Sequence, residues 1–245
     1  MTAVLKQILL MTDGHSNEGE DPVAIARLAQ EHGICINVIG ITEEGPDQYR
    51  GLEEIEAIAL AGGGVSEIVT KKQLVRTVQT VTRRAMTQTL QHVVQQELKH
   101  IFPEKEGLHD VSPDDRGQIV EVTERLGEAV SLEVLVLIDT SASMTDKLPM
   151  VQEALMDLSL SLNARLGDSL FCLYSFPGKS DPIDRLVDWT PRLTSLTQAF
   201  AQLTPKGLTP TGPALQAGIG VFSSRREKRR RLYGEQQRRA RRLGN

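Results

Sequence analysis

Two short apolar runs of this chain each end in an aspartate, and this feature limits the possible folds more than any other. The stretch VLVLIDTSASM spans residues 134–144 and the stretch ILLMTDG spans residues 8–14, so that Asp139 and Asp13 stand where the apolar residues stop. Unbroken apolar runs of this length are typical of strands covered on both faces, as in a parallel sheet. We therefore expect two buried strands that each carry an acid at the carboxyl end.

Strand-like and helix-like segments alternate along the first third of the chain. Asp21 and Pro22 supply an N-cap and a first-turn proline for a helix that we expect to end at Gly33. The β-branched run 34–41 and the run 65–70 predict two further strands, with a helical pattern between them. The order strand, helix, strand, helix, strand predicts a parallel sheet with right-handed connections.

The same alternation starts again after residue 131. The expected elements are a strand over 132–138, a helix from 148, strands over 170–176 and 185–189, a short helix over 194–203 and a last helix entered over 215–222. The strand over 185–189 is polar, which is typical of the edge of a sheet. We therefore predict an α/β fold with a doubly wound, mostly parallel sheet flanked by helices.

A long helical pattern and an acidic segment separate these two halves. Residues 71–102 contain no proline or glycine, and a helix of that length would measure ~48 Å. A strand of five or six residues measures only ~17–20 Å, so the helix must break or overhang the sheet. Residues 103–130 are acidic and interrupted by proline and glycine, which favours a linker with one helix from Ser112.

The charge of the chain is distributed unevenly. Residues 221–245 hold ten Arg or Lys against two Glu, a net charge of +8, although the whole chain has a formal net charge of -4. Residues 1–220 therefore carry 18 - 30 = -12. Such a basic tail is either a solvated extension or a weak contact for a polyanion, that is, a nucleic acid or an acidic membrane surface.

The composition is that of a globular chain without a membrane anchor. With 245 residues, of which 40% are hydrophobic, the chain can bury a sizeable core. No apolar run approaches the ~20 residues that span a bilayer, and no secretory signal pattern opens the chain. Cys35 and Cys172 lie in strand-like apolar runs, where we expect reduced core residues. We expect a soluble, cytoplasmic protein.

Five oxygen-bearing residues predict a metal site. Taken singly, Asp139, Ser141 and Ser143 are ordinary helix caps, Asp13 belongs to a turn signal, and Thr209 before a proline is another cap. Taken together, they can meet at one edge of the sheet, because the carboxyl ends of parallel strands share that edge. A set of oxygen donors without His or Cys suits Mg²⁺ or Mn²⁺.

The motifs around these residues resemble those of one family. VLIDTSASM resembles the DxSxS element of the von Willebrand factor A domain, GLTPTGPAL resembles its threonine loop, and ILLMTDG resembles its aspartate element. Together these elements form the metal-ion-dependent adhesion site of that family, here of a bacterial type. The resemblance implies direct ligation by Ser141, Ser143 and Thr209, whereas Asp139 and Asp13 mainly hold coordinated waters.

The order of the motifs differs from the usual family order, in which the DxSxS strand comes first and the aspartate strand fourth. Each motif occurs once, so we interpret the chain as a circular permutation. Residues 1–85 would then form the C-terminal-type half, 86–130 the connection, 131–222 the N-terminal-type half and 223–245 the basic tail. The alternative is a reciprocal swap in which each half completes a partner chain, so a monomer and a swapped dimer both remain possible.

The resemblance implies a non-enzymatic, metal-dependent protein-binding module that takes an Asp or Glu of a partner. The alternative is a Mg²⁺-dependent aspartyl phosphatase-like enzyme with Asp139 as the nucleophile, although that class would place a second acid where Ser141 stands. His15 beside Asp13 is more simply a solvated residue than a general base. The motifs supply no clear lysine or histidine to act as an acid, which favours the binding module.

Overall fold

The structure is a computed structural model. It describes residues 4–14, 16–42, 51–70, 73–101, 117, 121, 127, 129–194 and 196–243, with the backbone alone at residues 75, 92–101 and 228–243. The expected roles of His15 and of a helix from Ser112 lie outside the described residues.

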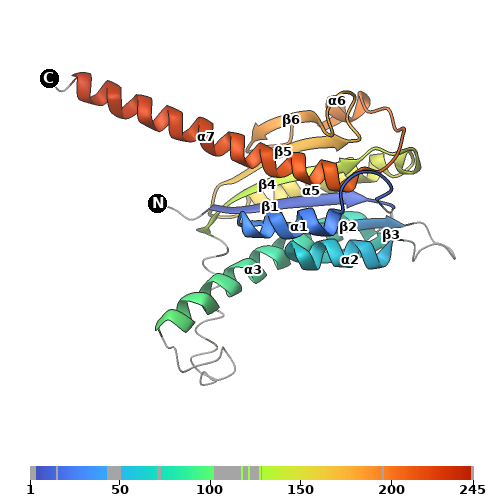
Figure 1. Ribbon diagram of the computed structural model, residues 1–245, viewed down its shortest axis with the longest axis horizontal. Coiled ribbons are helices and arrows are strands. Elements are labelled where there is room, and N and C mark those ends of the chain that lie inside the picture. Colours follow the sequence, from blue (N-terminus) through green and yellow to red (C-terminus); the bar gives the residue numbers. More distant parts are fainter. Residues whose placement is uncertain are drawn as a thin grey trace.

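One sheet joins the two halves of the chain, with its strands in the order β3-β2-β1-β4-β5-β6 (Figure 1). Neighbouring strands are parallel from β3 to β5, and β6 is antiparallel to β5. Their bounds are Val4–Thr12 for β1, Ile34–Thr42 for β2, Gly63–Thr70 for β3, Ser131–Asp139 for β4, Ser169–Phe176 for β5 and Asp184–Thr190 for β6. The prediction of an α/β fold with a mostly parallel sheet is confirmed, and so is the polar edge strand.

Helices cover both faces of this sheet, as Figure 1 shows. Helices α1 (Pro22–Glu31), α2 (Leu52–Ala61) and α7 (Thr211–Leu243) pack on one face, and α3 (Leu74–Ile101), α5 (Leu148–Asn163) and α6 (Leu196–Ala201) pack on the other. The apolar runs of β1 and β4 are buried because they face a helical layer on each side. Ile8 contacts the first layer and Leu9 the second, which explains why these strands have no polar face.

The helix ends follow local signals in the sequence. The carboxylate of Asp21 accepts a hydrogen bond from the Val23 amide at 2.9 Å, so the predicted N-cap of α1 is confirmed. Helix α1 ends at Glu31, and Gly33, with φ +69°, turns the chain into β2. Helix α7 begins earlier than the sequence indicates, because the Ala214 amide already donates to the Pro210 carbonyl at 3.1 Å.

Helices α3 and α7 extend beyond the sheet on the side where β1 and β4 begin (Figure 1). Helix α3 is one unbroken element of 28 residues, about 42 Å long, so the predicted long helix overhangs instead of breaking. Its buried side chains reach from Leu74 to Leu90. The linker over 103–130 lies mostly outside the described residues, and the four-part division of the chain stays a prediction.

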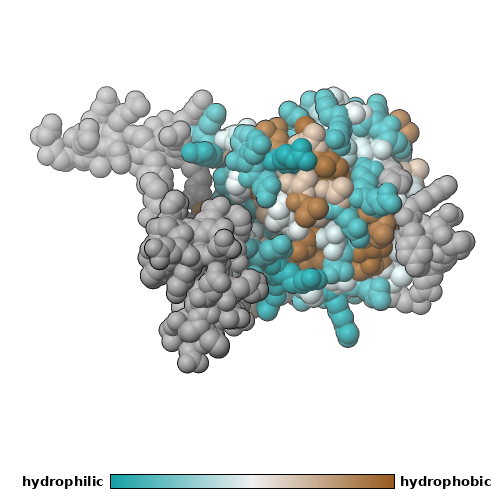
Figure 2. Space-filling view, turned by 60° about the horizontal axis from the view of Figure 1, so that its bottom comes forward, coloured by the Kyte–Doolittle hydropathy of each residue, from teal (hydrophilic) through white to brown (hydrophobic). Residues whose placement is uncertain are grey.

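The surface shows hydrophobic patches between hydrophilic side chains on the face in Figure 2. In the described part of the chain, the large apolar side chains that are exposed are Leu60, Met156, Leu160, Leu166 and Leu208. Single exposed apolar side chains are normal on a folded protein. Among the helices that the structure describes, none combines the length and the apolar character needed to cross a membrane.

Candidate metal centre

Strands β1 and β4 lie side by side, with Met11 opposite Ile138, so Asp13 and Asp139 follow two neighbouring strands at one edge. From β1 the chain passes through α1 to β2 on one side, and from β4 it passes through α5 to β5 on the other side. The strand order therefore reverses between β1 and β4. In open α/β sheets this reversal creates the crevice in which ligands bind.

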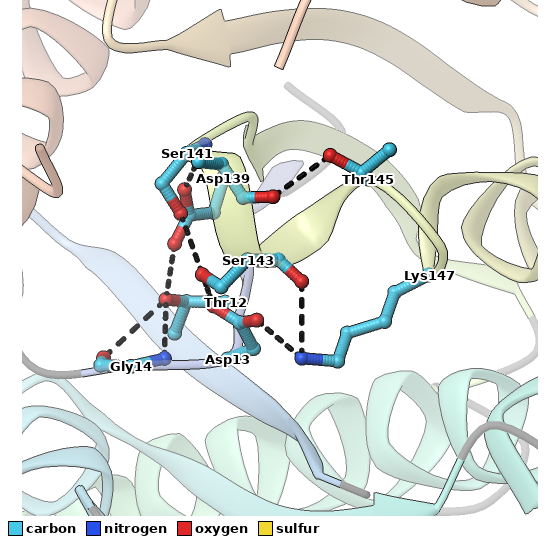
Figure 3. Close-up of polar contacts among 9 residues, drawn as sticks. Thr12, Asp13, Gly14, Asp139, Ser141, Ser143, Thr145 and Lys147 are labelled. Atoms are coloured by element: carbon cyan, nitrogen blue, oxygen red, sulfur yellow. Dashed lines mark hydrogen bonds and ion pairs between the residues drawn. The ribbon is translucent and has the colours of Figure 1, made fainter. Parts of the chain in front are cut away.

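The carboxylate of Asp139 is fully buried and fixed at both oxygens (Figure 3). Its Oδ1 accepts a hydrogen bond from the Ser141 amide at 2.8 Å, and its Oδ2 accepts one from the Thr12 hydroxyl at 2.7 Å. Burial raises the pKa of Asp139, whereas these hydrogen bonds act in the opposite direction. Asp139 thus closes its own loop and ties β4 to β1.

A chain of side-chain oxygens continues from this loop to the end of β1. The hydroxyls of Ser141 and Ser143 lie 3.2 Å apart, and the Ser143 hydroxyl donates to Asp13 Oδ1 at 2.8 Å (Figure 3). Neither hydroxyl caps the short 3-10 helix η3 (Ala142–Met144) or α5. The capping interpretation therefore does not account for the two serines, whereas Asp139 accepts a hydrogen bond from the backbone amide of Ser141, the residue just before η3.

Lys147 is the residue that the sequence analysis missed. It directly precedes α5, and its buried ammonium forms an ion pair with Asp13 Oδ2 and donates to the Ser143 carbonyl at 3.2 Å. The sequence analysis expects no clear lysine to act as an acid here, and the structure places the ammonium of Lys147 against Asp13. Residues 141–147 form successive helical turns, so a lysine four positions after Ser143 returns to the same side of the chain. The spacing alone does not identify it, because the turns between Ser143 and α5 are seen only in the structure.

Thr209 is brought to the same edge by backbone contacts of its loop. Its amide donates to Asn17 Oδ1 at 2.8 Å, its carbonyl accepts from the Asn17 amide at 3.2 Å, and the Lys206 amide donates to the Thr140 carbonyl at 2.9 Å. The loop therefore contacts the segments that follow both β1 and β4. The Thr209 side chain has no hydrogen bond to Asp13, Asp139, Ser141 or Ser143, so its ligation stays a prediction.

Gly212 explains why the threonine loop lies so close to the β1–α1 loop. A Cβ atom at this position would stand 1.9 Å from the carbonyl oxygen of Glu20, which no side chain tolerates. Gly212 and the following Pro213 belong to the first turn of α7, where proline is tolerated because the first amides have no partner within the helix. The glycine thus allows the helix and its preceding loop to approach the site.

The oxygen atoms fit a hard divalent cation. In an octahedral shell with metal–oxygen distances of 2.0–2.1 Å, adjacent oxygens lie ~2.9 Å apart. The separation of 3.2 Å between the hydroxyls of Ser141 and Ser143, two of the expected direct ligands, is close to this value. No group of three or more His, Cys, Asp or Glu suited to a metal occurs in the described part of the chain, so a zinc-type cluster is not indicated there.

Comparison with known proteins gives two close relatives. The chain is 52% identical over 234 residues to the protein YabS of Bacillus subtilis (strain 168), which is described as uncharacterized, and the match covers 96% of each chain. It is 39% identical to an uncharacterized protein from Alicyclobacillus acidocaldarius whose crystal structure superposes with a TM-score of 0.84, over 92% of this chain and 96% of that one. No family model matches the chain.

A more distant structure is proximal thread matrix protein 1 of the mussel byssus, in the form with zinc in its metal-ion-dependent adhesion site. It is 16% identical, with a TM-score of 0.28 over 86% of this chain and 44% of that one. A similarity of this size supports no argument about this chain.

Proposed function

We propose that this chain, which belongs to the family of the Bacillus subtilis protein YabS, is a non-enzymatic module that binds a protein partner through Mg²⁺ or Mn²⁺. The observation that carries the proposal is the line of oxygens from Ser141 through Ser143 to Asp13, next to the buried Asp139. This line lies where the strand order reverses. The resemblance of the three motifs to a von Willebrand factor A domain supports the same conclusion.

Each residue has a defined role in the proposed site. Ser141, Ser143 and Thr209 bind the cation directly, and Asp139 and Asp13 orient its coordinated waters. Because the three direct ligands are neutral, a bound cation keeps positive charge toward an open position and attracts a carboxylate. Ser143 is exposed, so an Asp or Glu of the partner can reach this side of the site.

The enzyme alternative is less well supported but is testable. A nucleophilic Asp139 needs a free carboxylate oxygen, whereas both of its oxygens accept hydrogen bonds and the residue is fully buried. Lys147 adds an ammonium to the site, but this ammonium is paired with Asp13 and not with Asp139. Generic phosphatase and ATPase assays with Mg²⁺ should detect no turnover. Turnover that disappears in Asp139→Asn would replace the binding proposal with the enzyme.

The pairing of β1 with β4 within one chain supports the circular permutation over the domain swap. In a permuted monomer, the two halves share one sheet without a partner chain. The protein should therefore elute and scatter light as a monomer of 27.0 kDa. A stable dimer whose site forms only on dimerisation would favour the swap.

The proposal is tested by metal binding and by metal-dependent capture. Mn²⁺ is titrated calorimetrically into chelator-treated protein, and the immobilised protein is used to capture partners from a lysate with and without chelator. Ser143→Ala and Asp139→Asn should weaken both. The matched control is Asp146→Asn, an exposed acid in the same loop that makes no contact with the proposed ligands, and it should behave as the wild type. Absence of Mn²⁺ binding by the wild type would refute the proposal.

A further inference from the structure

The proposed metal site contains a buried cation of its own. Lys147 is only 6% exposed, its side chain lies against Asp13, and the Asp13 side chain is 2% exposed. Its ammonium also donates to the Ser143 carbonyl at 3.2 Å. A buried ammonium is tolerated in a protein when a carboxylate compensates its charge, and a buried carboxylate is tolerated when a cation compensates its charge. Lys147 and Asp13 are therefore mutual counter-ions.

The contacts of Lys147 compete with those that a bound metal needs. Asp13 Oδ2 pairs with the ammonium, and Asp13 Oδ1 accepts from the hydroxyl of Ser143, which is itself a proposed metal ligand. Both oxygens of Asp13 are thus engaged, so a coordinated water would have to share Asp13 with the ammonium of Lys147 and the hydroxyl of Ser143. A divalent cation bound at Ser143 would also lie close to the ammonium of Lys147. The two positive charges would repel each other strongly, because the buried ammonium is poorly screened by water.

We infer that Lys147 is the resident cation of this centre: its ammonium neutralises Asp13 when no metal is bound, and it must release Asp13 before a divalent cation can bind. This inference rests on the proposed function. It has three consequences. The lysine stabilises the fold without metal, and it makes metal binding weaker than the ligand set alone allows. It also leaves the loaded site with one more positive charge, which favours an acidic partner.

The experiment compares metal affinity in three variants with that of the wild type. Lys147→Met removes the ammonium, Lys147→Arg keeps a cation, and Lys206→Met removes an exposed ammonium from the loop whose backbone contacts Thr140. Calorimetric titration with Mn²⁺ should show about tenfold or more tighter binding by Lys147→Met. Lys147→Arg and Lys206→Met should stay within about twofold of the wild type.

Melting temperatures provide a second readout. In chelator, Lys147→Met should melt below the wild type, because Asp13 then lacks its counter-ion. Added Mn²⁺ should raise the melting temperature of Lys147→Met more than that of the wild type, because the metal takes over the missing charge and binds more tightly. The same increase in both proteins would contradict the inference.

The outcomes separate the inference from the proposed function. If the wild type binds Mn²⁺ and Lys147→Met binds it equally or more weakly, the inference is wrong and the metal site stands. If neither protein binds Mn²⁺, both are wrong. Should Lys147→Met not fold, the ammonium resonance of Lys147 in wild-type protein with ¹⁵N-labelled lysine decides. Mg²⁺ should shift or broaden that resonance, and an unchanged resonance at saturating Mg²⁺ would overturn the inference.

Discussion

Arg225 on α7 forms an ion pair with Glu133 inside β4, with Nε and Oε1 2.9 Å apart, and its guanidinium lies 4.5 Å from the centre of the Trp189 ring. Glu133 is 5% exposed, and Arg225 supplies positive charge to this buried carboxylate. The pair holds the last helix on the sheet at the opposite end from the proposed metal site. The basic tail begins at this anchor.

Removing Arg225 should therefore destabilise the fold. Arg225→Met removes the guanidinium that pairs with the buried Glu133, which should cost about 3 kcal/mol of unfolding free energy. Chemical denaturation measures this loss, and Arg226→Met, at an exposed position, should change the free energy by less than about 0.5 kcal/mol. The double variant Arg225→Met, Glu133→Gln should recover part of the loss, because it also removes the buried negative charge. Equal effects of the Arg225 and Arg226 variants would show that the pair contributes nothing.

The ion pair between Arg225 and Glu133 also determines how much of the basic tail can be deleted without destabilising the fold. A deletion from residue 225 would remove the partner of Glu133, whereas a deletion of residues 228–245 keeps it and still removes eight of the ten basic residues. The shorter protein should keep its Mn²⁺ affinity and its melting temperature. Its binding to heparin or duplex DNA should weaken and lose most of its salt dependence. Unchanged polyanion binding would mean that the tail is only a solvated extension.

Thr12 should prove as important to the site as the predicted ligands. Thr12→Val removes the hydroxyl that donates to Asp139 Oδ2, so a buried carboxylate loses one of its two hydrogen bonds. The unfolding free energy in chelator should fall by about 1–3 kcal/mol. Thr12→Ser keeps the donor and should restore most of the stability and the Mn²⁺ affinity. If serine rescues neither quantity, the effect of valine comes from packing.

Much of this site could be predicted from sequence, because its residues follow strands that the apolar runs identify. The rules of parallel sheets predict that Asp13 and Asp139 lie at one edge of the sheet, and the structure shows that their strands are neighbours. Lys147 could not be assigned in this way, since the position of its ammonium depends on the turns between Ser143 and α5. From sequence alone, a buried and paired lysine in that segment cannot be distinguished from a solvent-exposed one.

The fold was predictable to a similar degree. The strands, the three-layer arrangement and the polar edge strand follow from hydrophobic patterning. The start of α7 was placed too late because Gly212 and Pro213 interrupt a helical pattern, although a helix tolerates both in its first turn. For α3, patterning predicted the length but could not decide between a break and an overhang, since that depends on where the sheet ends.

The two cysteines should behave as unreactive core thiols. Cys35 and Cys172 are both buried and free, and burial raises the pKa of each thiol, that of Cys35 to about 11. A thiol reagent at pH 8 should modify both only after unfolding. The ordinary thiol pKa is 9.0, so thiols of the unfolded chain ionise first as the pH rises. The contribution of Cys35 to stability should be unchanged below about pH 9 and should fall between about pH 9 and 11. Cys35→Ala should reduce that fall.

The proposed circular permutation can be tested by reversing it in the laboratory. Glu133, which contacts Arg225, lies opposite Lys6 near the start of β1, so the end of the anchored part of α7 is close to the first strand. A short Gly/Ser linker can join residue 227 to residue 4. The new N-terminus belongs at residue 127, because the Gly127 carbonyl accepts a hydrogen bond from Arg165 and should be kept. The new C-terminus belongs at residue 101, where α3 ends. The rearranged chain then runs from 127 to 227 and from 4 to 101, with the DxSxS strand first.

This rearranged protein should fold and bind Mn²⁺ with the affinity of the parent truncated after residue 227. Every strand pair and every proposed ligand is retained, and close ends of a domain tolerate rejoining. Far-ultraviolet circular dichroism, the melting temperature in chelator and calorimetric Mn²⁺ titration test the three properties. A folded protein without Mn²⁺ binding would show that the original connectivity positions the site. A protein that fails to fold would show that residues 102–126 do more than connect the two halves.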